Sequence, residues 1–153
     1  MSEPPGDSCE FAAKDLIVKF DLRVAGDVQA ITPAVEHIMR IVDGMACGAG
    51  KEFEIETAIR ESLANAIVHG CKEDRRRFVN ISVSCDEQRG MIIVVRDPGD
   101  GFDPKTIPNP VTGERLYAEH GRGIYLIDRL MDEVRFRKGG TEIWMRKDTA
   151  GDG

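Results

Sequence analysis

Hydrophobic and polar residues alternate with a helical period over residues 51–70, KEFEIETAIRESLANAIVHG. Glu61, Asn65 and His69 recur every four residues and predict one polar helix face. Apolar residues at three- and four-residue intervals predict a continuous stripe on the other side. That stripe comprises Ile55, Ile59, Leu63, Ala66, Ile67 and Gly70. The pattern therefore predicts one helix that packs one face on a core and presents a carboxylate, an amide and an imidazole on the other.

Two further stretches have a helical period. Residues Thr32–Met45 predict a helix with Thr32 as the N-cap and Pro33 at the first helical position. Residues Gly121–Met131 predict the last helix of the chain. The residues expected to face inward are Val35, Ile38, Met39 and Val42 in the former, and Ile124, Leu126, Ile127, Leu130 and Met131 in the latter.

Five stretches with apolar alternation or a β-branched run predict strands. They are Leu16–Val24, Phe78–Asp86, Met91–Arg96, Val134–Arg137 and Glu142–Arg146. The order β-α-α-β-β-α-β-β is typical of an α+β fold, a two-layer α/β sandwich with a mostly antiparallel sheet and helices on one face. Residues Asp103–His120 carry three prolines and no periodic pattern. A loop of this length is uncommon in a compact domain, so we expect it to be a lid.

Length and composition indicate one ordinary domain. The chain has 153 residues, and we expect residues 13–147 to fold while residues 1–12 and 148–153 form disordered tails. A net charge of −6 argues against direct binding of nucleic acid. No apolar run is long enough to span a membrane, and no secretory signal is present. The four cysteines form no CxxC pair, so we expect a cytoplasmic protein whose cysteines are reduced and act as small hydrophobic residues.

The polar face of the helix over residues 51–70 carries candidate chemistry. Glu61 is a carboxylate that can take a proton, and Asn65 offers an amide oxygen to a hard cation such as Mg²⁺. This pair suits Mg²⁺-dependent phosphoryl transfer. The alternative is that these residues are only the solvated side of an amphipathic helix, and the segment by itself does not decide between the two.

Two glycine-bearing motifs lie at predicted element boundaries. In D-P-G-D-G-F, Asp97 follows a buried strand and can accept a hydrogen bond from an exocyclic amine such as that of adenine. Gly99 and Gly101 would let the backbone approach a planar ligand, although a simple Asp/Gly turn is the alternative. In H-G-R-G-I, the glycines precede a helix, so its free N–H groups and Arg122 could bind phosphate. The alternative there is a plain junction between loop and helix.

In this order, the motifs E-x-x-x-N-A-x-x-H-G, D-x-G-x-G-F and G-R-G-I resemble the GHKL ATPases of the Bergerat fold, also called histidine-kinase-like ATPases. More narrowly, the chain resembles the anti-sigma factor serine-protein kinases of bacteria, from Leu16 to Lys147.

The resemblance implies a role for each matching residue. Glu61 would be the general base and Asn65 the Mg²⁺ ligand. We expect His69 to cap or pack at the helix end, because a lone histidine is more often structural than catalytic. The expected ATP-binding residues are Asn65, Asp97, Gly99, Gly101, Gly121, Arg122, Gly123, Ile124 and Thr141. Of these, Asp97 and Thr141 would contact the adenine, and Arg122 would also act in catalysis.

The resemblance also implies a function. The protein would sequester a sigma factor and use ATP and Mg²⁺ to phosphorylate a serine or threonine of a STAS-type anti-anti-sigma antagonist, as a homodimer. One alternative is an ATP-dependent binding module with little turnover. The other is the catalytic domain of a two-component histidine kinase, although the sequence carries no sensor, no dimerisation helix pair and no HE-type phosphoacceptor site.

Overall fold

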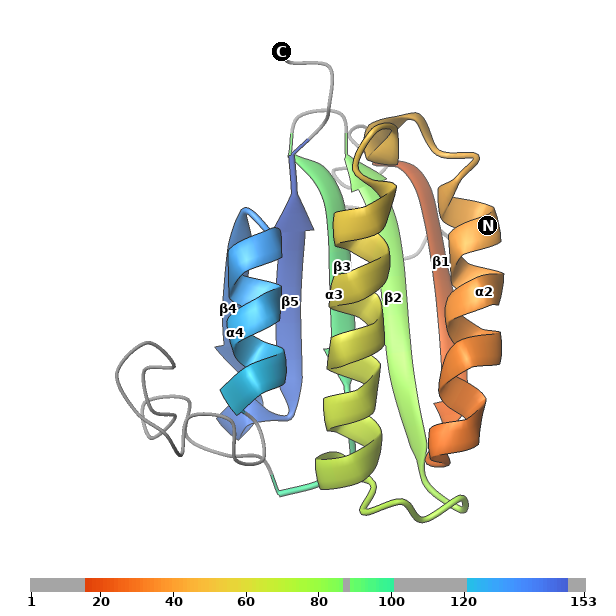
Figure 1. Cartoon of the computed structure of the whole chain (residues 1–153), viewed down its shortest axis with the longest axis vertical. Helices are drawn as coiled ribbons and strands as arrows, with labels where there is room; N and C mark the ends of the chain where they lie inside the picture. The colour runs from red at the N-terminus through yellow and green to blue at the C-terminus, as the bar shows by residue number, and fades with distance from the viewer. Residues whose placement is uncertain (1–15, 87–88, 101–120, 149–153) are drawn as a thin grey trace, which may run out of the picture.

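The computed structural model describes residues 16–86, 89–100 and 121–148. Their elements form two layers, a five-stranded sheet and three helices that all cover the same face of it (Figure 1). The opposite face of the sheet carries no helix of the described chain (Figure 1). The predicted lid, Asp103–His120, and most of both predicted tails lie outside these residues.

The sheet has the strand order β1-β2-β3-β5-β4, and every neighbouring pair is antiparallel. Its strands are β1 (Leu16–Ala25), β2 (Phe78–Asp86), β3 (Gly90–Arg96), β4 (Glu133–Arg137) and β5 (Glu142–Lys147). Alternate residues point to opposite faces, so Val79, Ile81 and Val83 of β2 are buried under the helices. The predicted α+β class and all five strands are confirmed.

The helices match the predicted segments with one error of capping. The elements are α2 (Ile31–Val42), α3 (Glu52–Asn65) and α4 (Gly121–Leu130), with short turns η1 (Val28–Ala30), η2 (Ala46–Gly48), η3 (Ala66–Gly70) and η6 (Lys138–Gly140). Thr32 is not an N-cap and Pro33 is not the first helical residue, because η1 runs straight into α2, which places the cap at Ala30 and makes Ile31 the first residue of the helix. Thr32 Oγ1 instead accepts a hydrogen bond from Arg60 Nη1 at 3.1 Å.

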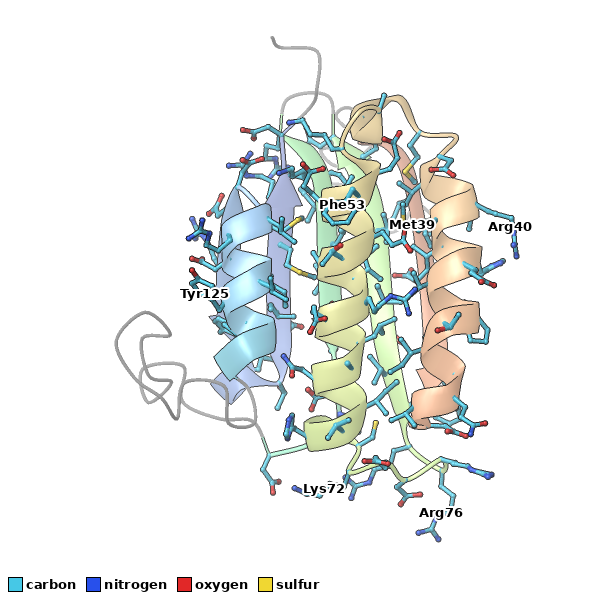
Figure 2. All side chains as sticks on the ribbon, viewed as in Figure 1. Met39, Arg40, Phe53, Lys72, Arg76 and Tyr125 are labelled. Atoms are coloured by element: carbon cyan, nitrogen blue, oxygen red, sulfur yellow. A yellow bond between two sulfur atoms is a disulfide. The ribbon has the colours of Figure 1, made fainter. Side chains whose placement is uncertain are left out.

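The hydrophobic core lies between the sheet and the helices. The central helix α3 and its extension η3 contribute Ile55, Ile59, Leu63 and Ile67, all fully buried. Charged side chains such as Arg40 and Arg76 project outward from the two layers (Figure 2). Burial of this stripe fixes the rotation of α3 about its axis and therefore fixes where its polar residues point.

The prediction that all cysteines are reduced is wrong for two of them. Cys47 in η2 and Cys85 in β2 form a disulfide, with their Cα atoms 6.1 Å apart. The bond is buried and ties the connection between α2 and α3 to the sheet. Packing brings together two residues that are 38 positions apart, which cysteine spacing does not reveal. Cys71 is a free, buried cysteine, as predicted.

Candidate functional site

The last turn of the central helix departs from regular α geometry. After Asn65, residues Ala66–Gly70 form a π-helical turn, and Cys71 N donates to Ala66 O at 2.8 Å to close it. Single π turns inside helices occur frequently at functional sites. Nothing in the periodicity of the sequence signalled this turn.

The end of the π turn packs directly against Asp97, which follows strand β3. A Cβ atom added to Gly70 would lie 2.3 Å from Asp97 Cγ, and one added to Gly99 would lie 2.7 Å from Gly70 O. No side chain fits at these distances. Gly70 and Gly99 therefore allow Asp97 to lie against the helix end, a role of Gly70 that the apolar pattern of the sequence does not predict.

Backbone hydrogen bonds hold Asp97 in this position. Asp97 N donates to Thr141 O at 2.9 Å, and Gly99 N donates to Asp97 Oδ1 at 2.8 Å. Burial raises the pKa of the half-buried Asp97 carboxyl, and the hydrogen bond from Gly99 lowers it in part. The fold therefore shields one carboxyl group at the end of β3 from water. Such burial is typical of a side chain that accepts a hydrogen bond from a ligand.

The Glu61 and Asn65 side chains meet the first turn of α4. A Cβ atom at the buried Gly123 would lie 3.1 Å from Glu61 Oε1 and 3.1 Å from Asn65 Nδ2. Helices α3 and α4 lie side by side along the sheet (Figure 1). The carboxylate and the amide therefore face the N-terminus of α4, where unpaired N–H groups favour anions.

The structure brings together residues from three motifs that are far apart in sequence. The end of η3, the end of β3 and the start of α4 lie at one end of the molecule (Figure 1). Of the predicted ATP-binding residues, Asn65, Asp97, Gly99, Gly123 and Thr141 lie at these junctions.

Ile124 is half-buried in α4. Gly121 and Arg122 open that helix. The side chain of Arg122, and Gly101 as a whole, lie outside the described part of the chain.

The donor set beside Gly123 fits a magnesium ion that arrives with a nucleotide. Among the described residues, no three His, Cys, Asp or Glu side chains group to hold a metal. Glu61 and Asn65 offer one carboxylate and one amide. Mg²⁺ keeps several waters and needs only one or two protein oxygens beside substrate phosphates. The sparse set therefore suits Mg²⁺ shared with a nucleotide rather than a metal held by the protein alone.

Comparison with known families agrees with this geometry. The histidine kinase-like ATPase domain matches residues 24–147, which covers nearly the whole described fold. The chain belongs to this family, and its fold is that of a histidine kinase-like ATPase domain. No helix within the described ranges is long and apolar enough to cross a bilayer.

Curated relatives within this family indicate more narrowly which proteins the chain resembles. The chain is 32% identical to the serine-protein kinase RsbW of Bacillus subtilis over 130 residues, 75% of this chain and 79% of that protein. It is 30% identical to RsbW of Staphylococcus aureus over 132 residues, 78% and 82% of the two chains. It is also 30% identical to the anti-sigma F factor of Priestia megaterium over 99 residues, 61% and 67% of the two chains. The predicted resemblance to anti-sigma factor serine kinases is confirmed.

Proposed function

We propose that this protein is an anti-sigma factor with ATP-dependent serine/threonine kinase activity. It sequesters a sigma factor and phosphorylates a STAS-type antagonist on serine or threonine. The observation that carries the proposal is the contact of Glu61 and Asn65 with Gly123, at the same end of the molecule as Asp97. The names of the relatives, serine-protein kinase and anti-sigma F factor, support the same activity and a sigma factor as partner.

The nucleotide would lie across the three junctions. Asp97 accepts a hydrogen bond from the exocyclic amine of adenine, while the glycine contact between Gly70 and Gly99 leaves no side chain in the way. The phosphates lie toward the N-terminus of α4, where backbone N–H groups and Arg122 bind them. Asn65 would hold Mg²⁺, which would neutralise charge on the phosphates.

Glu61 acts as the general base in the transfer. The hydroxyl oxygen of the substrate serine or threonine forms a bond to the γ-phosphorus, and the bond to the β,γ-bridging oxygen breaks to release ADP. The hydroxyl proton passes to the Glu61 carboxylate. Positioning and charge neutralisation carry most of the rate in phosphoryl transfer, so the contact of Glu61 with α4 matters as much as its basicity.

The proposal extends to features that follow from the resemblance. These are a homodimeric state, a cytoplasmic location and a part in the stress response. A histidine-kinase catalytic domain is not favoured, because the relatives above are serine-protein kinases. An ATP-dependent binding module with little turnover differs from the proposal only in the absence of a phosphorylated product.

The test is to incubate the protein with Mg·ATP and a candidate STAS protein and to measure the intact mass of that protein. We expect one added phosphate with the wild type. Glu61→Gln should bind ATP with unchanged Kd and transfer none, because the base is lost while the binding groups remain. Glu56→Gln on the same helix is the matched control, since its exposed pair with Arg60 contributes little. Transfer by Glu61→Gln at the wild-type rate contradicts the base assignment.

A further inference from the structure

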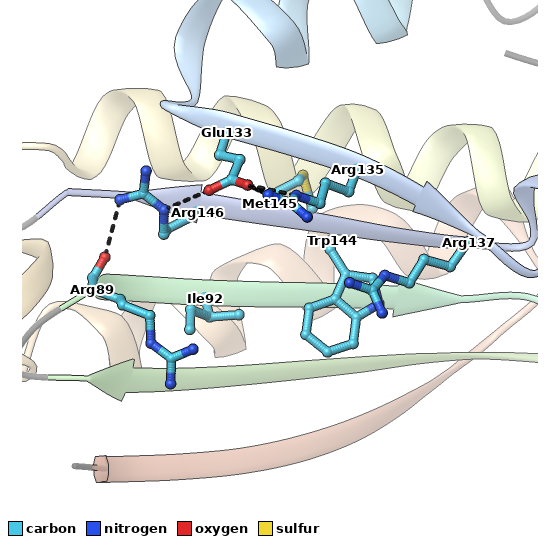
Figure 3. Close-up of a pocket in the computed structure, with 8 residues that line it drawn as sticks. All are labelled: Arg89, Ile92, Glu133, Arg135, Arg137, Trp144, Met145 and Arg146. Atoms are coloured by element: carbon cyan, nitrogen blue, oxygen red, sulfur yellow. Dashed lines mark hydrogen bonds and ion pairs between the residues drawn. The ribbon is translucent and has the colours of Figure 1, made fainter. Parts of the chain in front are cut away.

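A basic hollow lies on the face of the sheet that the helices leave open. It has a volume of about 300 Å³ and spans β3, β4 and β5 (Figure 3). Four arginines line it, Arg89, Arg135, Arg137 and Arg146, around Trp144. The chain as a whole carries a net charge of −6, so this concentration of cations is local. The nucleotide site lies in the helical layer on the other side of the sheet.

The arginines exceed the carboxylates available to them. Among the described residues that line the hollow, Glu133 is the acidic one, and it accepts hydrogen bonds from both Arg146 and Arg135. These two guanidiniums, Arg146 first, hold the pKa of Glu133 below its ordinary value. Arg137 forms no ion pair with any residue of the described chain. Arg146 also pairs with Asp148, and Arg89 pairs with Asp86. Within the described residues, four guanidiniums thus share three carboxylates, Arg137 is the one without a carboxylate partner, and the hollow retains positive charge.

Trp144 provides a fixed apolar floor for this charge. Its Nε1 donates to Glu142 Oε1 at 3.0 Å. The Arg137 guanidinium lies over the indole, 4.7 Å from the ring centroid (Figure 3). Trp144 pairs across the sheet with Val94, which is buried although it lies on this open face. An arginine held over an aromatic ring is pre-oriented, so a ligand carboxylate meets it at a smaller entropic cost.

We propose that this hollow is a docking site for an acidic segment of a partner protein, bound in extended conformation along β4. Arg135 and Arg137 are two residues apart on one strand, so their side chains leave the same face about 7 Å apart. Alternate residues of an extended peptide have the same spacing. Each guanidinium fork matches a carboxylate of aspartate or glutamate.

The surroundings favour an acidic peptide over a nucleic acid. Asp86 and Asp148 pair with Arg89 and Arg146 at the rim, and the net charge of the chain is negative. A nucleic acid carries many phosphates along its length. Those that extend beyond the hollow would be repelled by the negative charge of the rest of the chain. A short segment needs only the central arginines and the indole. The inference goes beyond the proposed kinase activity, because it concerns a different face of the sheet.

The single tryptophan of the chain makes the test direct, because its fluorescence reports on this hollow alone. The probe is a ten-residue peptide that alternates glutamate and serine, and the control peptide has glutamine in place of glutamate. We expect a saturable change in Trp144 fluorescence with the acidic peptide, weakened by added salt, and none with the neutral one. Arg137→Gln should weaken binding about tenfold, the effect of one charge-assisted hydrogen bond.

Matched controls distinguish a loss of peptide binding at the hollow from a loss of folding and from an effect on the nucleotide site. Arg40→Gln, an exposed arginine on α2, should leave peptide binding unchanged (Figure 2). Arg137→Gln should keep the wild-type circular dichroism spectrum and ATP affinity, so failure of either proposal leaves the other standing. Equal binding of the neutral peptide, or wild-type affinity in Arg137→Gln, overturns the proposal. Tighter binding of single-stranded oligothymidylate at the same salt, or self-association abolished by Arg137→Gln in sedimentation, overturns it in favour of a nucleic acid or a second copy.

Discussion

Replacing Gly70 by alanine tests whether the contact of the π turn with Asp97 builds the nucleotide site. The new Cβ would lie 2.3 Å from Asp97 Cγ and 2.7 Å from Asp97 Cβ. An ordinary contact starts at 3.4 Å, so the closer pair is more than 1 Å too short. Rotation of the carboxylate relieves the first contact but not the second, because the backbone fixes Asp97 Cβ. The end of β3 must therefore move away from the helix.

Two magnitudes follow from this displacement. Overpacking of a close contact costs about 1–3 kcal/mol of stability. The nucleotide loses a hydrogen bond to a charged group, worth about 1.5–3 kcal/mol. That loss corresponds to a Kd for ATP that rises about 10- to 150-fold. Affinity should therefore fall steeply while the protein still folds.

Isothermal titration calorimetry with Mg·ATP measures the affinity, and urea unfolding measures the stability. Gly44→Ala is the matched control, because its Cβ would meet only Ile41 O at an ordinary 3.5 Å. We expect Gly44→Ala to bind ATP as the wild type does. A folded Gly70→Ala protein with wild-type affinity for ATP would refute the reasoning, since Asp97 would then not need its present position.

Three further perturbations address the rest of the site and the fold. Gly123→Ala pushes on the Glu61 carboxylate and the Asn65 amide beside it, so it should weaken Mg·ATP binding and slow phosphoryl transfer about 10- to 100-fold in a single-turnover assay at saturating ATP; an unchanged rate contradicts this. Asp97→Asn should weaken ATP binding in calorimetry yet melt no lower than the wild type at pH 7. The reason is that a carboxyl whose pKa the fold raises costs stability once ionised, and this advantage of Asn should vanish as pH falls to about 4. A lower melting temperature at pH 7 argues against it. Reduction of the bond between Cys47 and Cys85 should lower the free energy of unfolding by about 2–4 kcal/mol in urea. Four titratable thiols in the unfolded, unreduced protein would rule that bond out.

The candidate site shows which functional residues can be predicted from local sequence patterns and which cannot. Glu61, Asn65 and Asp97 were found because their chemistry and spacing match a known constellation on a helix and after a strand. Gly70 was placed in the apolar stripe and at the end of the helix motif but was given no role in the site, although its backbone makes room for Asp97. That role depends on a contact between residues 27 positions apart, and no periodicity reports such a contact.

The sequence by itself determined the elements, their order and the sandwich. Side-chain periods of two and 3.6 act over a few residues and are readable without the fold. Only the tertiary structure decided which elements touch. Packing set the closeness of Gly123 to Glu61, the bond between Cys47 and Cys85, and the gathering of arginines around Trp144. Distances between residues remote in sequence follow from the burial of the whole core, which no single segment encodes.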